Sequence, residues 1–274
     1  MGETESPIES IAIGSFDGIH IAHRELIARA EGVAVIEREP RGRLTPGYKR
    51  SWYCEKPMAF YLFERIRHLG AREFVAMLRE DYPRLKRIVV GYDFRFGKDR
   101  EGSARDLEEI FEGEVEVIPE IALEGIPVHL RTIRELLSAG EPDRANRLLG
   151  RPYAVDGTPV RGQGLGSREF VPTINLVTEG YHLPAEGVYA GVTRLGDRRY
   201  KSAIFLGHRV STDGSFALET HLLEYDGAEL PPRIFVEFHR YLRPNRRFEC
   251  FEELRGQIGK DLEQVAEISM EIWK

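Results

Sequence analysis

The sequence predicts an α/β domain followed by a β-rich domain that ends in a helix. Strand-like and helix-like patterns alternate over the first half of the 274 residues, an order typical of a parallel sheet with helices on both faces. From about residue 150, alternating apolar and polar residues are separated by Gly, Asp and Pro turns. That second pattern favours an antiparallel barrel or sandwich. Helical spacing returns over residues 248–268.

The elements of the first half follow from the period of their apolar residues. Short apolar runs predict strands at residues 10–16, 32–37, 87–94 and 115–121. Apolar residues at helical spacing predict helices at 19–30, 57–70 and 71–83, the last of them stopped by Pro83. Two short helical pieces are expected between residues 135 and 150, closed by Gly150 and Pro152.

Strand-length runs dominate the second half. They lie at residues 153–164, 187–207, 216–227 and 233–243. Because the pattern changes near residue 150, we predict one domain over residues 1–149 and a second over 150–274.

Composition narrows the class of protein. A hydrophobic fraction of 42% with 31% charged residues is typical of a globular chain, and the net charge of −6 argues against a protein that coats nucleic acid. The apolar runs are too short to cross a bilayer. Cys54 and Cys250 fit no metal-binding spacing, which favours free thiols in a cytoplasmic protein. We expect no nucleic-acid or membrane partner, and the oligomeric state stays open.

A glycine turn after the first predicted strand is the first candidate site. Gly14 and Gly18 let the backbone turn sharply, and the unpaired N–H groups of the following helix suit a phosphate. His20 and His23, three residues apart, share one helix face and can add donors to the same anion. From spacing alone, a pair of packed histidines satisfied by carbonyls is an equal alternative. Zinc is a weaker one, because H-x-x-H lacks the spacing of the familiar zinc helix.

A second glycine-rich stretch precedes a short polar strand. Amides of a loop containing Gly162, Gly164 and Gly166 could surround phosphates, although hairpin turns use the same residues. Thr173 and Asn175 lie on one face of an extended segment and offer oxygen ligands that Mg²⁺ accepts. An ordinary polar strand face is the alternative.

Two segments of the first half carry a family resemblance. "GSFDGIHIAH" resembles the G-x-F-D-G-x-H-x-G-H segment of the HIGH-type nucleotidyltransferases. "VVGYDFRFGKDREG" is similar to the V-G-x-D-F-x-F-G segment of bifunctional bacterial riboflavin kinase/FAD synthetases. The resemblance implies a Rossmann-like domain that adenylylates FMN with ATP, giving FAD and pyrophosphate. It implies an ATP site that includes Gly14, Phe16, Asp17, Gly18, His20, His23 and Arg134, with Asp93 and Phe96 near flavin or ATP.

The second half resembles the riboflavin kinase of the same family. Its G-x-x-x-G…P-T-x-N segment is followed, in the family's order, by "PAEGVYAGV", "LETHLLEYDG" and "YLRPNRRFECFEELRGQIGKD". The resemblance implies a barrel with a terminal helix that phosphorylates riboflavin to FMN with Mg²⁺ and ATP. Glu219 would be the catalytic base, Thr173 and Asn175 would hold the metal, and Arg243 and Phe248 would contact flavin.

The chain departs from the family pattern at several positions. Ala22 replaces the second glycine of the histidine segment, and no F-x-P-H-P stretch is present. "VHLRTIR" retains Arg134 but has His129 and Leu130 where the family has a hydroxyl pair. The loop before Glu219 keeps Arg209 without the expected proline. A bifunctional enzyme is the leading interpretation. A kinase with a regulatory N-terminal domain and a binding module without chemistry are the alternatives.

Overall fold

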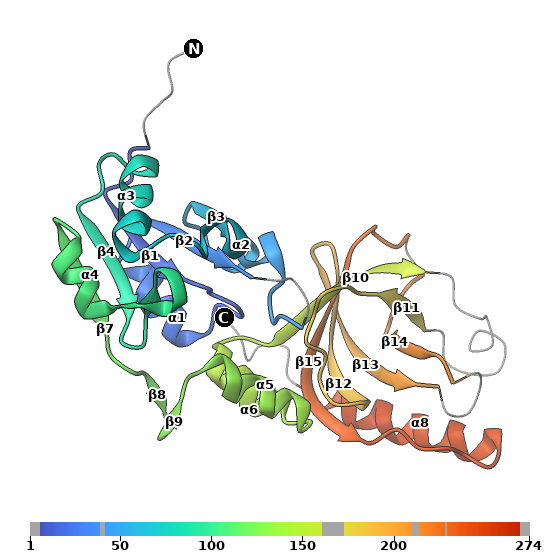
Figure 1. Ribbon diagram of the computed structural model, residues 1–274. Helices are drawn as coiled ribbons and strands as arrows, with labels where there is room; N and C mark the ends of the chain where they lie inside the picture. The colour runs from blue at the N-terminus through green and yellow to red at the C-terminus, as the bar shows by residue number, and fades with distance from the viewer. Residues whose placement is uncertain (1–5, 39–41, 161–172, 210–213, 228, 269–274) are drawn as a thin grey trace. The chain divides into compact units, whose positions relative to one another are not determined.

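The computed structural model describes the chain except residues 1–5, 39–41, 161–172, 210–213, 228 and 269–274. The chain forms two compact units, Met1–Leu130 and Arg131–Lys274 (Figure 1). Each unit has its own buried apolar core.

A five-stranded parallel sheet forms the centre of the first unit. Its strand order is β3-β2-β1-β4-β7, and each neighbouring pair is parallel. The strands are β1 (Ser10–Gly14), β2 (Gly32–Glu37), β3 (Met58–Leu62), β4 (Arg87–Gly91) and β7 (Glu114–Ile118). The order reverses direction between β1 and β4. In open α/β sheets, ligands bind beyond the carboxyl ends of the strands at such a point.

Helices pack on both faces of this sheet, as expected. They are α1 (Ile21–Ala28), α3 (Ala71–Asp81) and α4 (Ala104–Ile110). Ile11 and Ile13 of β1 share one apolar cluster with Phe74 of α3. Ala12, between them, belongs to a second cluster with Leu26 of α1. Because successive strand residues point to opposite faces, this double burial explains the continuous apolar run of β1.

The predicted helix at residues 57–70 is wrong over its first half. Met58–Leu62 form the edge strand β3, paired in parallel with β2, and helix α2 covers only Phe63–Ile66. Tyr61 of β3 donates a hydrogen bond of 2.7 Å to Asp81 of α3. Sheet pairing overrides the local helical spacing, since propensity over a few residues is a weak determinant.

Short elements complete the first unit. They are the 3₁₀ helices η1 (Gly47–Tyr53) and η2 (Lys98–Arg100), and the strand pairs β5 (Arg95–Phe96) with β6 (Gly102–Ser103) and β8 (Ala122–Leu123) with β9 (Ile126–Pro127).

The second unit is built on a closed antiparallel barrel, which decides between the barrel and the sandwich. Its strand order is β10-β11-β14-β13-β12-β15, and β15 pairs with β10 to close it. The strands are β10 (Tyr153–Val160), β11 (Ile174–Val177), β12 (Gly187–Leu195), β13 (Arg198–His208), β14 (Phe216–Leu222) and β15 (Ile234–Arg243).

The predicted terminal helix is α8 (Phe251–Ala266), which packs along the barrel (Figure 1). Val265 lies in an apolar cluster with Ala190 and Val192 of β12. Arg243 of β15 forms an ion pair of 2.8 Å with the buried Asp261 of α8. Apolar contacts and one well-shielded ion pair thus attach the helix to the barrel.

Two helices precede the barrel, α5 (Leu130–Ser138) and α6 (Pro142–Leu149). Asn146 of α6 donates to the carbonyl of Phe238 at 2.8 Å and accepts from the amide of Tyr153 at 2.6 Å. The helix ends at Gly150, whose φ of 67° suits glycine. The compact units therefore divide after Leu130, whereas the sequence pattern changes near residue 150. The division of the two activities at 149/150 stays a prediction.

Across the described ranges of the chain, no helix is both long enough and apolar enough to span a membrane.

Candidate active sites

The loop after β1 carries most of the residues predicted for the first site. Gly18 has a φ of 88°, and the bulky Phe16 and Ile19 have φ of 47° and 43°. Side chains of that kind rarely adopt positive φ, so the conformation must be held by its surroundings. Phe16 and Ile19 are fully buried in the apolar cluster around β1 and α1. The loop is therefore held by its own buried side chains.

The two histidines meet at the start of α1. His20 is the residue before the first helical turn, and its Nδ1 accepts a hydrogen bond of 3.3 Å from the amide of His23. The rings stack with centroids 3.5 Å apart. Since a helix N-terminus carries partial positive charge, both imidazoles lie where an anion is favoured.

One ring nitrogen of His23 is not satisfied by a carbonyl of the described residues. Its Nδ1 is buried and has no hydrogen-bond partner in the part of the chain that the structure describes. Burial lowers the pKa of His23 well below its usual value, and the neighbouring His20 and Arg50 lower it further. The lowered pKa favours the neutral ring, which leaves a buried, unsatisfied polar atom near the start of α1. Within the described residues, no group of three His, Cys, Asp or Glu side chains could hold a metal ion.

Asp17 and Thr45 hold the same loop through hydrogen bonds. Its fully buried carboxylate accepts the amide of Thr45 at 2.9 Å, and the Thr45 hydroxyl accepts the amide of Gly18 at 2.7 Å. Arg43 approaches the carboxylate to 4.0 Å. Asp17 thus joins the loop to the segment that follows β2, and Thr45 is a loop-holding residue that sequence reasoning missed.

A buried ion pair lies beside this loop. Arg50 of η1 is fully buried, forms an ion pair with Glu37 at the end of β2, and donates to the carbonyl of Gly47 at 2.9 Å. Burial raises the pKa of Glu37 although Arg50 opposes the rise, and burial also lowers the pKa of Arg50. The sequence analysis did not identify Arg50.

The segment after β4 leaves the sheet beside the histidine loop, because β4 is the neighbour of β1. Asp93 is exposed in this segment, and Phe96 is buried against Phe94 and Phe74, with ring centroids 5.6 and 5.7 Å away. The structure thus brings the predicted residues of both segments to one edge of the sheet.

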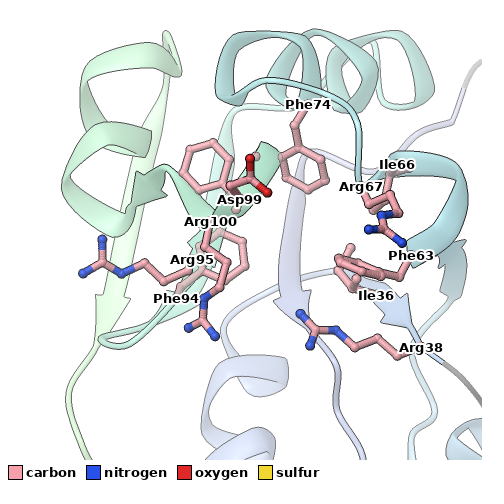
Figure 2. A pocket seen from close by; sticks show the side chains of 12 residues that line it. Ile36, Arg38, Phe63, Ile66, Arg67, Phe74, Phe94, Arg95, Asp99 and Arg100 are labelled. Atoms are coloured by element: carbon pink, nitrogen blue, oxygen red, sulfur yellow. The ribbon is translucent and has the colours of Figure 1, made fainter.

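Phe96 also lines a pocket that is open to solvent (Figure 2). Four phenylalanines and four arginines dominate its walls, which consist of Ile36, Arg38, Phe63, Ile66, Arg67, Phe74, Phe94, Arg95, Phe96, Gly97, Asp99 and Arg100. The guanidinium of Arg38 lies 4.5 Å from the centroid of the Phe63 ring. Aromatic walls with surrounding positive charge suit a flat ring system that carries a phosphate.

The last residue predicted for the first site, Arg134, lies on α5 in the second unit. Its carbonyl is 3.2 Å from Nε2 of His182. Its role toward ATP stays a prediction.

The predicted kinase residues meet on two neighbouring barrel strands. Asn175 of β11 stands directly opposite Glu219 of β14 in the antiparallel register. The Thr173 hydroxyl donates to Oε2 of Glu219 at 3.3 Å. Arg209 donates through Nε to Oε1 of Glu219 at 2.6 Å and through Nη2 to Oδ1 of Asn175. A carboxylate, two neutral oxygen groups and a guanidinium therefore form one cluster.

Not every residue predicted for the kinase site joins this cluster. Gly162, Gly164 and Gly166 lie outside the described residues. Arg243 is engaged by Asp261, and its guanidinium is 5.6 Å from the centroid of the Phe248 ring. A flavin contact by Arg243 or Phe248 stays a prediction.

Comparison with known proteins identifies the two units. The riboflavin kinase family model matches residues 149–269, and the FAD synthetase model matches residues 57–130. A bifunctional riboflavin kinase/FMN adenylyltransferase from Pseudomonas fluorescens is 30% identical, over 91% of this chain and 89% of its own. The chain belongs to this bifunctional family. The enzyme of the same name from Escherichia coli K12 is 29% identical over 92% of this chain and 90% of its own.

A solved structure agrees in fold across both units. It is a crystal structure described as a macrolide-efflux protein from Streptococcus pneumoniae, with a TM-score of 0.86, 25% identity and coverage of 96% of each chain. The described function of that protein differs from the names of the curated relatives. The match therefore supports the shared architecture of the family and nothing about its chemistry.

Both family models match this chain, which favours the bifunctional interpretation over a kinase with a regulatory partner domain. The departures at Ala22 and at residues 128–134 are consistent with membership at about 30% identity. Within the family's kinase unit, Arg209 is the residue whose contacts sequence reasoning did not foresee.

Proposed function

We propose that the chain makes flavin cofactors in two ATP-dependent steps, one in each unit. The barrel unit phosphorylates riboflavin to FMN, and the parallel-sheet unit transfers an adenylyl group to FMN, giving FAD and pyrophosphate. The observation that carries the proposal is the match to bifunctional relatives over about nine tenths of the chain, with both family models in order.

In the kinase step, Glu219 accepts the proton of the terminal ribityl hydroxyl. The oxygen freed of its proton attacks the γ-phosphorus of ATP, a new O–P bond forms, and the bond to ADP breaks. The Glu219 side chain is mostly buried beside Arg209 but keeps 19% of its surface exposed, which suits a base that must reach a substrate hydroxyl. Asn175 lies directly opposite Glu219 on the neighbouring strand β11.

Oxygen ligands beside Glu219 fit a magnesium ion that accompanies ATP. Thr173 offers a hydroxyl and Asn175 an amide oxygen, both of the hard type that Mg²⁺ prefers. Arg209 occupies one lone pair of the Asn175 oxygen, and a carbonyl oxygen has a second. When bound there, the ion would neutralise charge on the phosphoryl oxygens.

In the adenylylation step, the phosphate of FMN attacks the α-phosphorus of ATP, and pyrophosphate leaves. No proton must be removed from the attacking phosphate, so the task of the protein is positioning and charge stabilisation. His20 and His23 at the N-terminus of α1 would contact the phosphoryl oxygens. Gly14, Phe16, Asp17 and Gly18 would shape the loop around the nucleotide.

The phenylalanine and arginine pocket would receive FMN (Figure 2). Its aromatic walls suit the isoalloxazine ring, and its arginines suit the phosphate that distinguishes FMN from riboflavin. Phe96 would be a wall of this pocket, and Asp93 would lie at the neighbouring strand end.

Incubation with riboflavin, MgCl₂ and ATP, followed by chromatography of the flavins, tests the proposal. We expect both FMN and FAD. FMN without FAD would reduce the function to a kinase, and the absence of both would leave a binding module. A cytoplasmic location stays a prediction.

A further inference from the structure

The side chain of Arg209 makes three polar contacts at the kinase site, and the proposed kinase step gives this residue no role. Each of its nitrogens that can donate has a separate acceptor. Nε donates to Glu219 Oε1 at 2.6 Å, Nη2 donates to Asn175 Oδ1, and Nη1 donates to Ser215 Oγ at 2.8 Å. The side chain therefore connects the carboxylate on β14 with the amide on β11.

The backbone of Arg209 is itself held in place. It follows β13 directly, and its amide donates to the carbonyl of Ser215 at 2.9 Å. Its carbonyl accepts the amide of Gly214 at 3.1 Å. The backbone of Arg209 is therefore hydrogen-bonded to the two residues that precede β14, and its side chain is only 20% exposed. An anchored, shielded guanidinium loses little further freedom when it orients its neighbours.

Glu219 is held from both sides by this arrangement. Arg209 binds Oε1 and the Thr173 hydroxyl binds Oε2. A general base works only when its lone pair is directed at the proton it removes, and small displacements of such a group are costly. The two contacts limit rotation of the carboxylate while leaving a second lone pair on each oxygen.

We propose that Arg209 is a positioning residue of the kinase site, which orients Glu219 and Asn175 together through its forked guanidinium. This inference rests on the proposed kinase function. Arg209 acts through these two side chains and not on the substrate. A lysine cannot replace it, because its donors all lie on one nitrogen, whereas the planar guanidinium presents donors on three separate nitrogens to the three acceptors.

The test is steady-state kinetics of FMN formation by full-length Arg209→Lys and Arg209→Ala, with ATP and riboflavin varied in turn. We expect kcat to fall about 10- to 100-fold in both variants, as for a catalytic group displaced from its working geometry. The KM values should change by less than about threefold, because no substrate contact is lost. Added guanidinium ion, below unfolding concentrations, should restore part of the kcat of Arg209→Ala.

Arg198→Ala is the matched control, since Arg198 begins β13, the strand that Arg209 follows, and pairs with the exposed Asp226 at 3.2 Å. It should keep wild-type kcat. FAD formation from supplied FMN and the melting temperature report whether each variant folds. If Arg209→Ala does not fold, the kinetics of Arg209→Lys test the proposal.

Three results would overturn the proposal. They are an unchanged kcat in Arg209→Lys, a rise in the KM for ATP with kcat intact, and a loss that guanidinium does not restore. The second would make Arg209 a substrate-binding residue. If the wild-type protein forms no FMN, the proposed kinase function itself is wrong. That result differs from the three above, in all of which the wild-type protein forms FMN.

Discussion

The loop between β1 and α1, residues 15–20, and the barrel cluster of Thr173, Asn175, Arg209 and Glu219 are held in place by different means. Beneath the loop, Asp17 and Arg50 are fully buried, and two bulky residues adopt positive φ. In the barrel, Arg209 and Glu219 are each about one-fifth exposed, and regular strands place the carboxylate. Changes beneath the loop should therefore cost stability as well as activity. Changes in the barrel cluster should cost activity with little loss of stability.

The largest expected effect is in the barrel. Glu219→Gln keeps the shape of the side chain but removes the proton acceptor. We expect kcat for FMN formation to fall about 10²- to 10⁴-fold, the range for loss of a general base. FAD formation from supplied FMN should be unchanged, measured by chromatography. Full FMN formation by this variant would remove Glu219 from the proposed chemistry.

The corresponding change in the first unit is His20→Ala. Loss of a donor to the phosphoryl oxygens should lower the rate of FAD formation about 10²- to 10³-fold. Loss of the helix cap formed with the His23 amide should destabilise the first unit by about 1 kcal/mol. FMN formation should stay at the wild-type rate. An equal loss of both activities would show that the sites are not independent.

Arg50→Met tests whether buried charge holds the first site. Removing one partner of a buried pair leaves Glu37 uncompensated, which costs about 3–5 kcal/mol in the free energy of unfolding. Arg79→Met is the control in the same unit, because Arg79 pairs with the exposed Glu112 and such pairs contribute about 0–1 kcal/mol.

The double variant Arg50→Met with Glu37→Met should recover much of that loss, since two apolar side chains replace the ion pair. Denaturant unfolding measures all three proteins. A loss as small as that of Arg79→Met would show that the buried pair does not stabilise the loop.

The smallest expected effect is a pH dependence from His23. Its pKa is lowered in the folded protein by burial, so below its ordinary value of about 6.5 the unfolded chain binds a proton that the native ring does not. Stability of the first unit should therefore fall as pH drops from 7 to 5.5, by at most about 1.4 kcal/mol per pH unit. His23→Gln should show a flatter dependence in parallel unfolding titrations. Identical curves would contradict this assignment.

Much of the architecture could be predicted from the sequence because it depends on local period. The alternation of strand and helix patterns in the first half indicated a parallel sheet, and alternating residues after residue 150 indicated a barrel or a sandwich. Residues 58–62 could not be predicted, because their strand state depends on pairing with β2. No local pattern carries that information.

The candidate sites divide in the same way. The Asn175 and Glu219 positions were identified from motifs, and the register of β11 with β14 brings them together. Thr45, Arg50 and the three-way contact of Arg209 depend on tertiary packing of side chains with ordinary sequence surroundings. The contacts of these residues can be recognised only when the structure shows their partners.

The most direct test of the two-site account is complementation with riboflavin as the sole flavin. Glu219→Gln alone should form neither FMN nor FAD at an appreciable rate, and His20→Ala alone should accumulate FMN. An equimolar mixture should form FAD from riboflavin, because FMN made by one protein is adenylylated by the other. A mixture that accumulates FMN without FAD, although Glu219→Gln converts supplied FMN, would contradict free passage of FMN between sites. Failure of Glu219→Gln to convert supplied FMN to FAD, or failure of His20→Ala to form FMN, would contradict the assignment of one activity to each unit.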